Sequence, residues 1–184
     1  KSGINKVSLY AIKQILHFMN TVIVPVDFSE TSLNAANYAA QLLTGHYGVT
    51  MVLYHSYSKA SEAESAAESL EKLKAGIMKN HIVKMEVLAH EESDFVDGLE
   101  KAARHRRADL VIMGITGKSA IAQVFFGSNT LKMAERKVCP VLIVPENATF
   151  SPLKNVMLTS DFKNTLNSTP SVPIKDFLDV FSPQ

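Results

Sequence analysis

The chain of 184 residues lacks most features that would place it outside the ordinary globular class. Its single cysteine, Cys139, excludes an intramolecular disulfide and favours a reducing compartment, so we expect a cytoplasmic protein. No apolar run reaches the roughly 18 to 20 residues that span a bilayer. The formal net charge is only +1, whereas nucleic-acid-binding domains usually carry a basic excess. We therefore expect neither membrane nor nucleic acid as a partner.

The usual catalytic and phosphate-binding motifs are also missing. The six histidines show no metal-ligand spacing, and no Gly-x-Ser-x-Gly elbow is present. Gly117-Lys118-Ser119 resembles the end of a P-loop, but that motif needs glycine where Ile112 stands. The dinucleotide fingerprint fails as well, because no glycine lies two residues from Gly114. A phosphate site must therefore have another form.

Short apolar runs alternate with helical patterns along most of the chain. Strands are predicted near residues 22, 49, 82, 109 and 141, with helices between them. Ser29, Ser93 and Ser128 stand where helix N-caps belong. Because crossovers between parallel strands are right-handed, this order predicts an α/β fold whose sheet is covered on both faces. Residues 82–88 alternate between apolar and polar, which is typical of a half-buried edge strand.

Glycines gather around the fourth predicted strand and the helix that follows it. Gly114 and Gly117 come just past the strand's carboxyl end, and Gly127 directly precedes the helix that starts near Ser128. Ligands of open parallel sheets bind outside the carboxyl ends of the strands. A helix N-terminus offers free N–H groups and a positive dipole end, which suit phosphate. The pattern predicts nucleotide binding.

These glycines have the spacing Gly-x2-Gly-x9-Gly-Ser, which resembles the nucleotide-binding signature of the universal stress protein family. Residues 22–30, with Asp27, are similar to the family's first strand and aspartate turn, and residues 52–56 to its second strand. The resemblance covers roughly residues 20–146 in the right order. It implies a Rossmann-like, doubly wound, open parallel sheet of five strands in the order 3-2-1-4-5.

The resemblance also implies a set of adenine-nucleotide contacts. Asp27 would lie beside the adenine and ribose, Ser56 would contribute main-chain groups, and Met113 with Gly114 would border the ribose. Gly117, Gly127, Ser128 and Asn129 would form the phosphate cradle, mostly through backbone N–H groups and the Ser128 hydroxyl. The full set of implied contacts is Pro25, Val26, Asp27, Ser56, Met113, Gly114, Gly117, Gly127, Ser128 and Asn129.

Two of these assignments have a structural alternative. Asp27 is also a suitable turn residue, and Gly127-Ser128 also a plain loop and helix cap. Thr116 stands where family members often have histidine. The implied ligand is ATP, with AMP or ADP as alternatives and Mg²⁺ carried by the phosphates.

Three classes of function fit these residues. The first is a regulatory protein that binds ATP, the second a weak ATP hydrolase, and the third a scaffold that no longer needs nucleotide. Phosphoryl transfer needs an in-line nucleophile and charge-stabilising groups, and no acid–base pair beyond Asp27 is evident. We expect binding without efficient turnover, and the intact glycines argue against the scaffold.

The last predicted strand, residues 140–145, is bounded by Pro140 and Pro145 and is apolar throughout. The implied strand order puts it at a sheet edge, where an unpaired apolar strand favours pairing with another chain. We expect a homodimer through this strand.

The chain is divided into three parts. Residues 1–18 are predicted to be an extension, residues 19–147 the universal stress protein domain, and residues 148–184 the start of a second, incomplete repeat. The repeat rests on a constant offset of 134 positions, with a helix expected at 174–181; chance similarity is the alternative. The matching pairs are Val22 and Val156, Asp27 and Asp161, Phe28 and Phe162, and Thr31 and Thr165.

Overall fold

The five strands form one parallel sheet in the order β3-β2-β1-β4-β5. The computed structural model describes residues 19–115, 128–157 and 171–181. The predicted α/β class and strand order are confirmed. The strands are β1 (Thr21–Pro25), β2 (Thr50–Tyr57), β3 (Lys84–Glu91), β4 (Leu110–Ile115) and β5 (Val141–Pro145).

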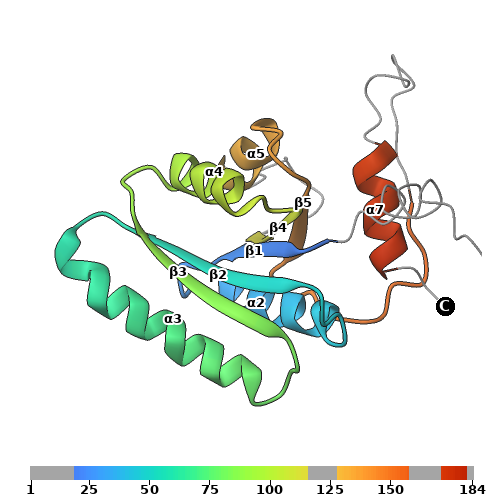
Figure 1. Cartoon of the computed structure of the whole chain (residues 1–184), viewed down its shortest axis with the longest axis horizontal. Helices are drawn as coiled ribbons and strands as arrows, with labels where there is room; N and C mark the ends of the chain where they lie inside the picture. Colours follow the sequence, from blue (N-terminus) through green and yellow to red (C-terminus); the bar gives the residue numbers. More distant parts are fainter. Residues whose placement is uncertain (1–18, 116–127, 158–170, 182–184) are drawn as a thin grey trace, which may run out of the picture. The chain divides into compact units, whose positions relative to one another are not determined.

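Helices cover both faces of the sheet (Figure 1). In the figure, α2 and α3 lie on one face, and α4 and α5 on the other. The central strand β1 is accordingly apolar after Thr21, with Val22, Ile23 and Val24 fully buried. The helices of this layer structure are α2 (Glu30–Leu43), the 3-10 turn η1 (Ala60–Glu62) with α3 (Ala63–Met78), α4 (Phe95–Arg106) and α5 (Ser128–Glu135).

The two edge strands differ in their side chains. In β3, exposed Lys84 is followed by buried Met85 as predicted, but the alternation ends there, because the residues from Glu86 to His90 are all half-buried. In β5, Val144 is buried, whereas Val141, Leu142 and Ile143 are half-buried. The β5 edge therefore leaves apolar side chains partly open within this chain.

Two of the predicted helix caps can be compared with the structure. Ser29 caps α2 as predicted, since its hydroxyl accepts from the Ser32 N–H at 3.3 Å. The cap predicted at Ser93 is wrong, because the Asp94 carboxylate accepts from the Asp97 N–H at 2.9 Å and α4 begins one residue later. A charged acceptor suits the positive end of a helix, so the aspartate takes the position.

Met19 and the described residues from 153 onward belong to a second compact unit, separate from residues 20–152. It contains α7 (Ser171–Phe181), in which the Phe177 and Phe181 rings lie 4.9 Å apart. This is the helix expected at 174–181. Val156 and Met157 are exposed and lie in no strand. The remaining positions of the proposed repeat, Asp161, Phe162 and Thr165, lie outside the described residues, so the incomplete repeat stays a prediction.

The segment that follows β5 is held against α2 by two side chains of that helix, Asn34 and Tyr38. Asn34 Nδ2 lies 3.3, 3.2 and 3.1 Å from the carbonyl oxygens of Pro145, Glu146 and Ala148. One turn later, the Tyr38 ring meets the Phe150 ring edge-on at 5.4 Å. Residues 145–150 therefore follow the same face of α2.

Replacing Asn34 by alanine should lower the free energy of unfolding by about 1 kcal/mol, because the carbonyls after β5 lose their shared donor. Asn37→Ala is the matched control: its amide only donates to Leu33 O of its own helix, at 3.0 Å. Urea unfolding of both variants tests this. Equal destabilisation of the two would show that the contact across the chain contributes nothing.

Candidate functional site

A pocket of about 420 Å³ opens at the carboxyl ends of β1 and β4. It lies where the chain reverses its direction of travel across the sheet, since β1 is flanked by β2 on one side and β4 on the other. Small-molecule sites usually measure about 300 to 1,000 Å³. The pocket is lined by Pro25, Val26, Asp27, Ser29, Thr31, Ser32, Phe95, Met113, Gly114, Ile115, Asn129 and Thr130.

Six of the residues predicted as nucleotide contacts line this pocket: Pro25, Val26, Asp27, Met113, Gly114 and Asn129. Ser56 lies near the end of β2, half-buried, and is not among the lining residues. Gly117 and Gly127 lie outside the described residues. Ser128 is the first residue of α5, and its side chain is also outside them. The structure thus brings together the residues of the first and fourth strands.

Asp27 is held in place by the start of α2. Its Oδ1 accepts from the Ser29 N–H at 3.0 Å and from the Ser29 hydroxyl at 2.6 Å. Its own N–H donates to Ser32 Oγ at 3.3 Å. The carboxylate is therefore fixed beside the first turn of the helix.

These hydrogen bonds also keep Asp27 charged. Burial alone would raise the pKa of the Asp27 carboxyl, but hydrogen bonds from Ser29, Ser32 and nearby backbone N–H groups hold that pKa below its ordinary value. The carboxylate is ionised at neutral pH. It suits donors such as sugar hydroxyls or an exocyclic amine, and it repels phosphate.

The residue after Asp27 has an unusual backbone. Phe28 has φ of +64°, a region that bulky residues rarely adopt. Its ring lies 4.9 Å from the His55 ring, and His55 Nδ1 lies 2.7 Å from Val26 O. Because a carbonyl oxygen only accepts, Nδ1 carries the proton and donates. Strand β2 thus supports the strained turn through His55, in addition to the contacts from α2.

Gly114 is required by packing, whatever the ligand. A Cβ there would lie 2.6 Å from Thr31 O and 2.9 Å from Thr31 Cγ2. The first turn of α2 therefore lies directly against the carboxyl end of β4. The prediction that Gly114 borders a ribose is not tested by this contact.

Half of the lining residues were not predicted from the sequence. The signal for Ser29 and Ser32 was available, because both follow Asp27 at the start of a helix. Phe95 lies on the apolar face of its helix pattern, where the sequence does not distinguish a pocket residue from a core residue. For Thr130, which is 3% exposed, the sequence carries no signal. The missed lining residues are Ser29, Thr31, Ser32, Phe95, Ile115 and Thr130.

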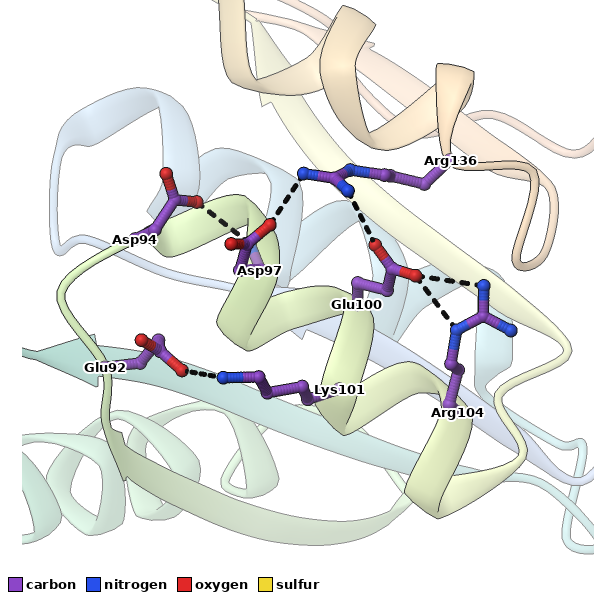
Figure 2. A network of polar contacts seen from close by, with 7 residues as sticks. All are labelled: Glu92, Asp94, Asp97, Glu100, Lys101, Arg104 and Arg136. Atoms are coloured by element: carbon purple, nitrogen blue, oxygen red, sulfur yellow. Dashed lines mark hydrogen bonds and ion pairs between the residues drawn. The ribbon is translucent and has the colours of Figure 1, made fainter.

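A network of charged side chains joins α4 to the end of α5 (Figure 2). Arg136, the residue after α5, pairs with Asp97 at 2.6 Å and with Glu100 at 3.3 Å. Glu100 also binds Arg104, one turn further along α4, at 2.9 Å. Exposed pairs contribute only about 0 to 1 kcal/mol each. Their effect is geometric, since α4 supplies Phe95 to the pocket and α5 supplies Asn129 and Thr130.

Other reactive chemistry is limited in the described part of the chain. Burial, together with the nearby Asp109 carboxylate, raises the pKa of the Cys139 thiol to about 11, so it stays protonated and a poor nucleophile. Among the described residues, no group of three or more His, Cys, Asp or Glu side chains is arranged to hold a metal ion. No described helix is long and apolar enough to cross a bilayer.

Comparison with known proteins agrees with the fold. A universal stress protein from Thermus aquaticus is 27% identical over 134 residues, which cover 67% of this chain and 97% of the relative. A universal stress protein solved in complex with cAMP aligns with a TM-score of 0.56 at 24% identity, covering 71% of this chain and 99% of that one. One from Archaeoglobus fulgidus in complex with dAMP aligns with a TM-score of 0.53 at 18% identity, covering 70% and 98%.

At these identities the structural likeness shows the fold alone. Family membership rests on a sequence match: residues 19–145 match the universal stress protein family. This match spans more than half of the chain and contains every residue predicted to contact the ligand. The chain belongs to the universal stress protein family.

Proposed function

We propose that this protein binds an adenine nucleotide, which is ATP, ADP or AMP. We further propose that it acts in the cytoplasm as a dimeric regulator of the stress response. The observation that carries the proposal is the pocket that joins an ionised Asp27 to the start of α5. A nucleotide site has to provide two kinds of group: hydrogen-bond acceptors for the nucleoside and N–H donors for the phosphates. The cAMP and dAMP complexes of the two similar structures support the adenine part.

The roles follow from charge. The Asp27 carboxylate contacts the hydroxyls or amine of the nucleoside, with Pro25, Val26 and Met113 as apolar surroundings. The phosphates lie away from this negative charge, near Asn129 and the loop before it. The residues proposed for the phosphates are Gly117, Gly127, Ser128 and Asn129, with Mg²⁺ entering on the phosphates.

We propose binding rather than turnover. Phosphoryl transfer needs a positioned nucleophile and usually metal ligands held by the protein. Among the described lining residues, Asp27 is the one carboxylate, and its proposed role lies at the nucleoside end, away from the phosphates. Hydrolysis of ATP is therefore the second candidate.

The dimer is proposed to form along β5. This strand is at the sheet edge and pairs only with β4 within the described chain. Its half-buried Val141, Leu142 and Ile143 offer apolar side chains on both faces of the strand that a second copy would cover.

Gly127→Val should abolish ATP binding, because the side chain would occupy the space of the phosphates. Ser128→Ala should cost less, about 1 to 2 kcal/mol, the scale of one hydrogen bond to a charged group. Titration calorimetry with ATP gives both values. Gly48→Val is the control, since a Cβ at Gly48 meets nothing within 4 Å. A folded Gly127→Val protein that binds ATP normally would show that the cradle is elsewhere.

Asp27→Ala should weaken adenosine and ATP by the same factor, on the order of 1.5 to 3 kcal/mol, because the lost acceptor serves the nucleoside. Glu30→Ala removes the same charge from the first turn of α2 at a residue outside the pocket lining, and it should bind both ligands normally. Calorimetry with the two ligands measures the difference. A loss for ATP alone would place Asp27 near the phosphates instead.

Leu142→Glu should convert the dimer to monomer, because the charge would be buried against the second copy. Leu131→Glu places the same charge at a leucine of α5 that is 46% exposed, and it should leave the dimer intact. Sedimentation velocity distinguishes the species. An unchanged dimer in Leu142→Glu would remove β5 from the interface.

A further inference from the structure

Phe95 has an unusual place for a core aromatic residue. It is the first residue of α4, and it packs against the apolar cluster that contains Tyr54, Leu99 and Met113. However, it is only partly buried, and it lines the pocket. One part of the ring therefore belongs to the core, and another part borders the space proposed for the ligand.

The core behind Phe95 leaves the ring little room to retreat. The Tyr54 ring lies 6.5 Å from the Phe95 ring at an interplanar angle of 59°, and Tyr54 is fully buried. A Cβ at Gly98 would lie only 2.5 Å from the Tyr54 hydroxyl, so α4 is packed tightly on Tyr54. A ligand that enters the pocket meets a supported aromatic wall.

The polar network fixes the helix that carries Phe95. Asp94, the preceding residue, caps α4 through the Asp97 N–H. Asp97 also pairs with Arg136 at the end of α5, as Figure 2 shows. These contacts hold the first turn of α4 relative to α5, the helix that brings Asn129 to the pocket. The separation between the aromatic wall and the polar wall is thereby set.

We propose that Phe95 forms the base subsite of the pocket, where the planar nucleobase packs against its ring. This inference rests on the proposed function, and it adds the part of the ligand that Phe95 recognises. A base has apolar faces and polar edges, and aromatic side chains bind the faces well. Among the described lining residues, Phe95 supplies the one aromatic ring, next to Met113, and the serine and threonine hydroxyls of the lining can serve the edges.

Two substitutions test the subsite. Phe95→Leu keeps an apolar side chain but removes the ring, so adenosine, AMP and ATP should each bind about tenfold more weakly. Phe95→Trp keeps a stacking surface and should restore the affinity. Because the chain has no tryptophan, this variant also carries a unique fluorophore, which should be quenched when adenosine binds. Phe150→Leu is the control for the loss of a ring outside the pocket and should bind normally.

The outcomes separate the subsite from the proposed function. If the parent protein binds no adenine nucleotide, the proposed function fails and the subsite with it. If the parent binds but folded Phe95→Leu binds adenosine equally well, the subsite alone is wrong. The same holds if Leu and Trp variants lose affinity alike, since the side chain would then serve packing only. Far-ultraviolet circular dichroism and melting curves confirm that each variant is folded.

Discussion

The contact between the first turn of α2 and the carboxyl end of β4 is the constraint on which the site depends. Gly114 permits it, because any Cβ there would enter the backbone of Thr31. Because the helix starts so close to β4, its first residues reach across the end of β1. Ser29, Thr31 and Ser32 therefore line the pocket, and a helix placed by ordinary side-chain packing would begin further from the sheet.

The turn at Asp27 and Phe28 has a strained backbone that neighbouring side chains hold in place. The positive φ of Phe28 costs on the order of 1 to 3 kcal/mol, so contacts on both sides must offset it. Ser29 and Ser32 hold Asp27 from α2, and His55 holds Val26 and the Phe28 ring from β2. A carboxylate fixed before a ligand arrives loses less conformational entropy on binding. The strain is consistent with a binding role for this turn.

Sequence patterns predicted the layers of the fold well, because most strands are short apolar runs and the helices have clear periodicity. The residues at the ends of the first and fourth strands were expected from the glycine spacing and from the resemblance to the universal stress protein family. The patterns could not predict side-chain geometry. Asp94 and not Ser93 caps α4, and this depends on where the helix starts to within one residue. Phe95 looked like any core aromatic, because its periodicity in α4 is the same whether or not the ring borders a pocket. The described structure adds His55, whose role depends on contacts between β2 and the turn.

The pocket and the β5 edge are physically continuous. In the register of the sheet, Gly114 lies beside Val144, and Ile115 beside Pro145, so two lining residues are neighbours of the proposed dimer strand. Asn34 then fastens the chain after β5 to α2, the helix that begins at the pocket. Contiguity alone does not couple two sites: a nucleotide changes the dimer only by binding one arrangement of β5 more tightly than another. In this fold, α2 and β4 are the elements through which a nucleotide could favour one arrangement of β5, because they contact both the pocket and β5 or the segment after it.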